Sequence, residues 1–258
     1  MLTGSAASSV VPSELDVLSE AMRLAKEAEE TGVPLRLVGG VAIHAHASSG
    51  IHAALLRDLN DIDLAIPREA SRSVAVLLER VGYEPERNFN ALNVGRRALY
   101  WETGGSRKLD VFIDELRMCH VVPLTRRIEV DAPTIPLAEL LLTKLQIFHL
   151  NEKDVRDMLV LLIEHEVGAG DRETVNADEI ARLCAADWGL WRTVRLNIER
   201  VKNALSAYDV SENETSRIAS RLELLWSRIE SQPKSRRWRA RSTLGDRVRW
   251  YEEPEEVD

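Results

Sequence analysis

The sequence predicts an α+β fold, with a small mixed β-sheet in its N-terminal half followed by a helical domain. Short strand-like segments alternate with helix-like segments up to about residue 132. After Pro133 and Pro136 the apolar residues recur at helical spacing, and no strand is recognisable as far as Glu230. We therefore predict three parts: an N-terminal α+β domain over 1–132, a helical domain over 133–232 and a charged tail over 233–258.

The N-terminal elements follow from local signals. Ser13, with Asp16 three residues later, is typical of a helix cap, and the apolar spacing that follows predicts a helix as far as Gly32. The segment DIDLAI alternates acidic and apolar residues, as a half-buried strand does. In order, we expect a helix to Gly32, a strand over 35–38, a helix over 41–47, a strand over 61–66, a helix over 69–81 and a hairpin of 97–103 with 109–113.

In the second half of the sequence, the apolar spacing predicts five helices, over 137–149, 152–166, 176–186, 188–207 and 212–231. Asn176 and Glu179 are typical of the cap of the third. The chain then loses periodicity, with a basic stretch over 234–249 and an acidic stretch over 252–258.

Composition excludes several classes of protein. The 258 residues include 45% hydrophobic and 29% charged residues, which is typical of a globular domain. No apolar run approaches the ~18 residues of a membrane span, and the first residues lack the basic and apolar parts of a signal peptide. Two cysteines at unsuitable spacing predict neither a disulfide framework nor a zinc site. The net charge of −8 excludes a general polyanion binder. We therefore expect a cytoplasmic protein with no membrane contact.

Three aspartates form the most informative pattern. Asp61 and Asp63 lie two residues apart on a predicted strand, so their carboxylates point to one face. Asp110 lies on a second predicted strand, and it joins them if the strands are neighbours. Neighbouring carboxylates repel one another unless a cation lies between them, and Mg²⁺ prefers oxygen ligands. The pattern predicts a site for phosphoryl or nucleotidyl transfer, although an Asp-x-Asp pair taken alone is usually a solvated strand edge.

Gly39 and Gly40 lie between a predicted strand and a predicted helix. Two glycines there let backbone N–H groups approach a phosphate at the start of the helix. The alternative is a tight turn without a ligand.

These motifs carry a resemblance to a known group. LVGG at 37–40, RDLNDIDLAI at 57–66 and KLDVFI at 108–113 resemble the glycine pair, the double carboxylate and the third carboxylate of the DNA polymerase β-like nucleotidyltransferase superfamily. The segment 140–162 is similar to a helix pair of AbiEii/AbiGii-type nucleotidyltransferases, some of which are toxins of toxin–antitoxin systems. The matching residues are Lys144, Leu145, Phe148, Arg156 and Asp157.

The resemblance implies a nucleotidyltransferase fold and an enzyme that moves a nucleoside monophosphate from an NTP to a hydroxyl. It implies that Asp61, Asp63 and Asp110 bind Mg²⁺, and that Gly39, Gly40, Lys144 and Arg57 contact the nucleotide, with Lys144 and Asp157 counted among the catalytic residues. The acceptor would be RNA such as a tRNA 3′ end, or a protein side chain, and a cognate antitoxin would be a partner. Two features depart from the family pattern: 20 residues separate Gly40 from Asp61, and Val160 replaces the second acid of the helix motif.

Several alternatives stay open at this stage. Lys144 and Asp157 also fit an ordinary surface ion pair, and Arg57 fits a structural role. His44, His46 and His52 lack carboxylate or cysteine companions at metal spacing, so no histidine metal site is expected. The basic tail contains Trp238 and Trp250, which suits RNA, but we favour a solvated charge run. Rival functions are a small-molecule nucleotidyltransferase of the aminoglycoside-modifying kind and a catalytically inactive interaction protein.

Overall fold

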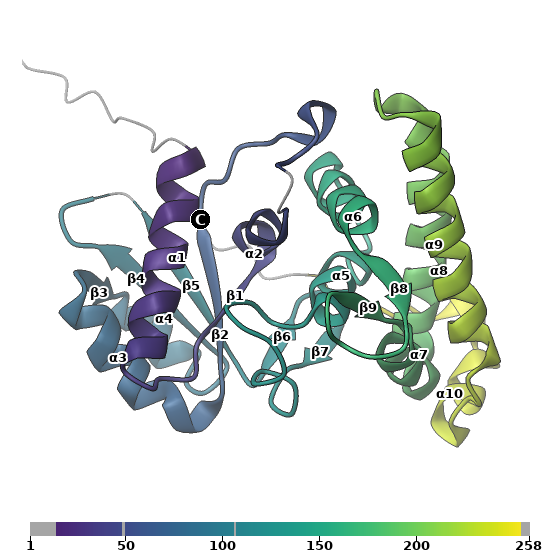
Figure 1. The fold of residues 1–258 in the computed structure, drawn as a ribbon. Helices are drawn as coiled ribbons and strands as arrows, with labels where there is room; N and C mark the ends of the chain where they lie inside the picture. Colours follow the sequence, from purple (N-terminus) through teal and green to yellow (C-terminus); the bar gives the residue numbers. More distant parts are fainter. Residues whose placement is uncertain (1–13, 48–49, 106, 254–258) are drawn as a thin grey trace, which may run out of the picture.

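The computed structural model describes residues 14–47, 50–105 and 107–253. Its N-terminal part contains a five-stranded mixed sheet, beside which the helices of the C-terminal part are stacked (Figure 1). The predicted α+β class with a small mixed sheet is confirmed. Among the described residues, no helix combines the length and the apolar character needed to cross a bilayer.

The sheet has the strand order β1-β2-β5-β4-β3. Only the central pair, β2 with β5, is parallel; each other neighbouring pair is antiparallel. The strand bounds are β1 Arg36–Val38, β2 Ile62–Ile66, β3 Tyr83–Pro85, β4 Arg97–Glu102 and β5 Lys108–Ile113. The predicted hairpin is therefore present as β4 and β5, and β3 is an edge strand that the sequence did not indicate.

Helices pack against this sheet and bury its apolar residues. Helix α1 contacts β1 and α2, while α3 contacts β3. Their bounds are α1 Glu14–Glu30, α2 Gly39–His46, α3 Ser71–Arg80 and α4 Arg87–Leu92, with short 3-10 turns at Ala53–Leu55 and Arg68–Ala70. The predicted cap residue Ser13 lies outside the described residues.

The C-terminal part is mainly helical, as predicted. Its helices are α5 Leu137–Leu145, α6 Glu152–Glu164, α7 Ala177–Ala186, α8 Trp188–Ala204 and α9 Glu212–Ser231, followed by α10 Arg236–Ser242. Asn176 caps α7 as expected, since its side chain accepts hydrogen bonds from the backbone of Asp178 and Glu179.

The prediction that no strand occurs between Leu137 and Glu230 is wrong. Strands β8 Glu166–Gly168 and β9 Thr174–Asn176 pair in parallel between α6 and α7. Each strand has three residues, which is too short for alternation to be recognised in the sequence. A further unpredicted hairpin, β6 Glu115–Arg117 with β7 Val121–Pro123, leads from the sheet toward the helices.

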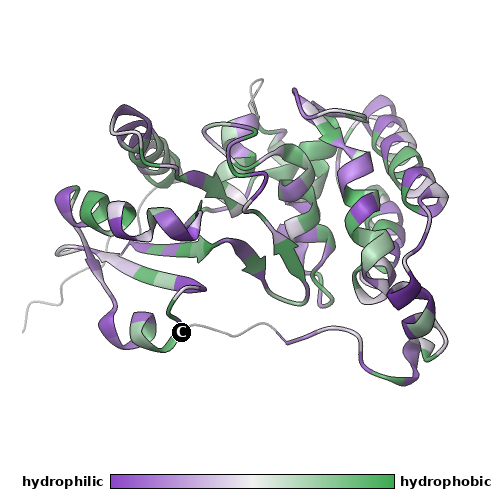
Figure 2. Ribbon diagram, turned by 90° about the horizontal axis from the view of Figure 1, so that it is seen from below, coloured by the Kyte–Doolittle hydropathy of each residue, from purple (hydrophilic) through white to green (hydrophobic). Residues whose placement is uncertain are grey.

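The described part of the basic stretch is not an unstructured tail. Helix α10 packs on α7 and α8, and the chain after it runs back toward the sheet (Figure 2), where the Glu252 amide donates to the Cys119 carbonyl. Trp250 forms edge-to-face contacts with Phe148 and Trp188. These contacts fix the segment because they bury aromatic surface.

Candidate active site

The sheet places two of the predicted carboxylates side by side. Asp63 of β2 and Asp110 of β5 are directly paired in the parallel register. Side chains at paired positions of neighbouring strands lie on the same face of a sheet. Asp61 lies two residues before Asp63, is exposed and precedes the first residue of β2. The expectation that the two aspartate-bearing strands are neighbours is thus met by the fold.

Gly39 brings the start of α2 against this carboxylate pair. It follows Val38, which is paired with Asp63 across β1 and β2. Gly39 has a φ of 67°, and a Cβ at this position would overlap the Asp63 carboxylate. Glycine is therefore required here for both its backbone conformation and its lack of a side chain. Val38, the residue before the first turn, provides no side-chain cap for the α2 amides.

Asp63 is in an unfavourable place for a negative charge. Burial, together with the charges of Asp61 and Asp110, raises its pKa to about 8, although Lys144 and Arg97 act in the opposite direction. Like charges in a half-buried site favour the protonated form, or a bound cation. The charges of both other predicted aspartates therefore act on Asp63.

Arg97 of β4 engages the third carboxylate. Its Nε donates to Asp110 Oδ1 over 2.7 Å, and its Nη2 donates to Oδ2. Its guanidinium also lies over the rings of Phe89 and Phe112. Because Asp110 is turned to Arg97 and Asp61 lies in an exposed loop, the oxygens of the three aspartates do not all lie within 4.8 Å of one another in the described structure.

A second cluster lies on the helices next to the sheet. Arg57 donates to both carboxylate oxygens of Asp157, over 2.7 and 2.8 Å. Lys144 of α5 lies 2.8 Å from Asp157 and 3.1 Å from Asp154, both on α6. Arg57 also lies against Gly40, where a Cβ would overlap its guanidinium. The second glycine of the pair therefore makes room for an arginine that bridges the N-terminal part and α6.

The charges of this helix cluster are balanced. Burial raises the pKa of Asp157, but Lys144 and Arg57 outweigh it, so the pKa lies below its usual value. Burial lowers the pKa of Lys144, but Asp157 and Asp154 outweigh it and hold the group charged. His44 lies beside the cluster, where burial and then the charge of Arg57 lower its pKa to about 4.

The structure thus brings the predicted site residues into two adjoining clusters. One holds Gly39, Asp63 and Asp110, with the exposed Asp61 at its edge acting on Asp63 through its charge. The other holds Gly40, Arg57, Lys144 and Asp157. Arg156 does not join them, since it pairs with Glu152 and the Leu56 carbonyl. Sequence reasoning missed Arg97 and Asp154; the only sequence signal at Asp154 was its place three residues after Asn151, which makes it part of a capping box.

Comparison with known proteins adds little to this geometry. No described protein family matches the sequence, and no curated protein matches it. Two solved structures are similar. One is ANT(2")-Ia in complex with adenylyl-2"-tobramycin, at 15% identity and a TM-score of 0.38, covering 55% of this chain and 86% of that one. The other is an antigenic nucleotidyltransferase-like protein from Paracoccidioides brasiliensis, at 11% identity and a TM-score of 0.41, covering 86% and 96%. Sequence identities and TM-scores this low do not assign an activity to this chain.

Proposed function

We propose that this protein is a Mg²⁺-dependent nucleotidyltransferase that moves a nucleoside monophosphate from an NTP to a hydroxyl. The observation that carries the proposal is the pairing of Asp63 with Asp110 in the register of β2 and β5, with Gly39 at the start of α2 packed against the Asp63 carboxylate. The pattern of glycine pair and three carboxylates belongs to the DNA polymerase β-like superfamily that the sequence resembles.

The donor set fits Mg²⁺. Asp61, Asp63 and Asp110 offer only oxygen atoms, which hard divalent cations prefer. The pKa of Asp63 is raised to about 8 by burial and by its acidic neighbours, and a cation among them would relieve this repulsion. Asp61 and Asp63 would hold the ion, and Asp110 would complete the site. Bound Mg²⁺ supplies charge neutralisation and orientation for the triphosphate.

The residues around the carboxylates suit the triphosphate. The first-turn amides of α2 lack a side-chain cap, and a helix N-terminus favours negative charge. Gly39 and Gly40 leave the backbone accessible to phosphate oxygens. Arg57 and Lys144 add positive charge nearby, although each already contacts Asp157. In nucleotidyl transfer such positioning and charge stabilisation supply most of the catalysis.

Asp110 is the candidate for accepting the proton of the attacking hydroxyl. Both of its oxygens accept hydrogen bonds from Arg97. Each carboxylate oxygen can accept a second hydrogen bond, so an acceptor hydroxyl can donate to Asp110 while Arg97 stays bound. We propose that Arg97 holds Asp110 in place for the acceptor.

For the acceptor we favour RNA, such as a tRNA 3′ end, over a protein side chain. Three arginines of α10, Arg236, Arg237 and Arg239, are exposed and form a local basic patch on a protein with a net charge of −8. In this setting the protein would be the toxin of a toxin–antitoxin system, with a cognate antitoxin as partner. A small-molecule acceptor, as in aminoglycoside modification, is the second candidate. The full set of aspartates favours either enzyme over an inactive interaction protein.

The test uses NTPs labelled at the α-phosphate, each incubated with the protein, Mg²⁺ and either total RNA, a protein extract or an aminoglycoside. We expect α-label in one acceptor fraction and none there from γ-labelled NTP, because the γ-phosphate leaves with pyrophosphate. Asp63→Asn is the inactive variant, and Asp209→Asn, which alters an exposed carboxylate outside the site, is the control. Absence of α-label in every fraction, or equal labelling by Asp63→Asn, overturns the proposal.

A further inference from the structure

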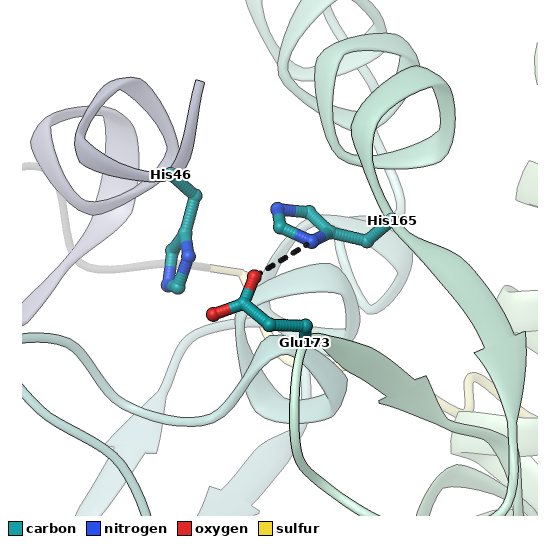
Figure 3. A group of neighbouring side chains, drawn as sticks. All are labelled: His46, His165 and Glu173. Atoms are coloured by element: carbon teal, nitrogen blue, oxygen red, sulfur yellow. Dashed lines mark ion pairs between the residues drawn. The ribbon is translucent and has the colours of Figure 1, made fainter. Parts of the chain in front are cut away.

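A second group of metal-binding side chains lies apart from the aspartates. It consists of His46, His165 and Glu173, each of which offers one ligand atom, and these atoms all lie within 4.8 Å of one another. Figure 3 shows both imidazole rings and the carboxylate turned toward a common space. His46 ends α2, His165 follows the last residue of α6, and Glu173 precedes β9. The companions that His46 lacked in the local sequence therefore come from a distant segment.

The distances suit a shared ion better than direct hydrogen bonds. His165 Nδ1 lies 3.6 Å from Glu173 Oε2, which is too long for a hydrogen bond. Two ligands of a tetrahedral ion with bonds of about 2.0–2.1 Å lie roughly 3.4 Å apart. The other ring nitrogen, His165 Nε2, is buried and has no hydrogen-bond partner among the described residues. A ring binds an ion through one nitrogen, so the ion takes either Nδ1 or this Nε2, which is costly to leave unsatisfied.

Thr134 fixes the state of the His46 ring. The Thr134 hydroxyl donates to the Ile135 carbonyl and lies 2.7 Å from His46 Nε2. Because the hydroxyl proton points to the Ile135 carbonyl, the Thr134 oxygen accepts a hydrogen bond from His46 Nε2–H. The lone pair of the neutral His46 ring is then on Nδ1, where it can bind a metal ion. Metal-binding histidines are commonly oriented by such an outer partner on the nitrogen that does not bind.

Electrostatics also favour a cation at this place. The C-terminal ends of α2 and α6 meet here, and each carries a partial negative charge.

We propose that His46, His165 and Glu173 bind one divalent transition-metal ion of the Zn²⁺ class, with water as the fourth ligand. Two imidazole nitrogens and one carboxylate oxygen suit Zn²⁺, whereas Mg²⁺ prefers oxygen ligands alone. The ion joins the C-terminal end of α2 to that of α6. Helix α2 begins with Gly39 and Gly40, and α6 carries Asp157. The metal therefore fixes the relative position of two helices that shape the candidate active site.

The test is a Zn²⁺ titration of the untagged, chelator-treated full chain, in competition with a chromophoric chelator. We expect one equivalent to bind, a rise in melting temperature, and with Co²⁺ a visible spectrum typical of tetrahedral coordination. Glu173→Gln should weaken Zn²⁺ binding at least about tenfold. Thr134→Val removes the outer partner of His46, together with the hydrogen bond to the Ile135 carbonyl, and should weaken binding about tenfold. Glu69→Gln, at an exposed carboxylate elsewhere, is the control and should bind as the wild type does.

Since Glu173 is exposed, its variant should fold, and its Zn²⁺ affinity is decisive. Equal affinity of the wild type and Glu173→Gln, or no binding by the wild type, overturns the proposal. Asp63→Asn should keep the zinc site, because its carboxylate belongs to the other site. Loss of nucleotidyl transfer in Asp63→Asn with retained Zn²⁺ binding separates this inference from the proposed function.

Discussion

The two clusters of the candidate active site contain the same kinds of residues in opposite states. On the sheet, Asp63 lies between acidic neighbours, and burial together with their charges raises its pKa to about 8. On the helices, Asp157 lies between Arg57 and Lys144, which outweigh burial and lower its pKa. The helix cluster is balanced by its own two cations and two carboxylates. In the sheet cluster, Arg97 pairs with Asp110, and the charges of Lys144 and Arg97 do not offset the effects that raise the pKa of Asp63.

This difference in charge balance indicates a structural role for the helix cluster and an ion-binding role for the sheet cluster. A balanced cluster has no need of a further ion, so its principal contribution is to hold α5, α6 and the segment of Arg57 together. An unbalanced cluster persists only because the surrounding fold fixes it, and strongly shifted carboxylates in such places mark functional sites. We therefore assign ion binding to the sheet and structural support to the helices, with Lys144 contributing to both.

The largest expected effect is on stability, in the helix cluster. Asp157→Ala leaves Arg57 and Lys144 buried without their shared carboxylate, which should lower the free energy of unfolding by about 3–5 kcal/mol. Adding Lys144→Met removes one of the two cations and should recover part of this loss. Chemical denaturation of the single and the double variant measures the free energy of unfolding. A loss below about 1 kcal/mol would show that the cluster behaves as a surface ion pair.

The next effect is on activity, in the sheet cluster. Asp63→Asn keeps the shape of the side chain but removes the negative charge, so transfer of α-label should fall at least about 100-fold. At pH 8.5, above the pKa of Asp63, the free energy of unfolding without Mg²⁺ should not fall, since a repulsive charge has been removed. Activity within about tenfold of the wild type would contradict the assignment.

Much of the fold could be predicted from the sequence, because the signals that indicate helices and strands are local. The alternation in DIDLAI indicated β2, and Ser211 with Glu214 forms a capping box at the start of α9, which spans the predicted 212–231. The balance of charges could not be predicted. Arg57 and Asp157 are 100 residues apart, and no local pattern indicates which carboxylate meets which cation. For the same reason the sequence indicated neither Arg97 on Asp110 nor His165 beside His46.

A smaller effect is expected at Lys144, which belongs to the balanced cluster but adjoins the sheet cluster. Lys144→Met should weaken NTP binding about tenfold, the equivalent of one charge-assisted hydrogen bond of roughly 1.5 kcal/mol. Nucleotide affinity and melting temperature are measured together. A lower melting temperature with unchanged affinity would give Lys144 a purely structural role.

The smallest expected effect is on RNA binding. Deleting 233–258 is unsuitable as a test, because Trp250 packs on Phe148 and Trp188. The double variant Arg236→Ala/Arg239→Ala alters only exposed residues of α10. It should weaken RNA binding less than tenfold and reduce the salt dependence by roughly 0.7 for each phosphate that the variant no longer neutralises. Arg72→Ala, on α3, is the matched control. An unchanged salt dependence would show that α10 does not bind the acceptor.

The sheet cluster can be tested most directly by its response to pH and Mg²⁺. The pKa of Asp63 is raised from 3.8 to about 8, so the folded protein keeps a proton that the unfolded chain releases. Without Mg²⁺, the stability of the wild type should therefore fall as the pH rises from about 4 to about 8, whereas Asp63→Asn should lack this contribution.

The decisive measurement is the melting temperature of the wild type and Asp63→Asn at pH 8.5, with and without Mg²⁺. We expect Asp63→Asn to be the more stable protein without Mg²⁺, and Mg²⁺ to raise the melting temperature of the wild type alone. If Asp63→Asn is less stable without Mg²⁺, or if Mg²⁺ raises both melting temperatures equally, the three aspartates are not an unbalanced ion site, and the central claim is wrong.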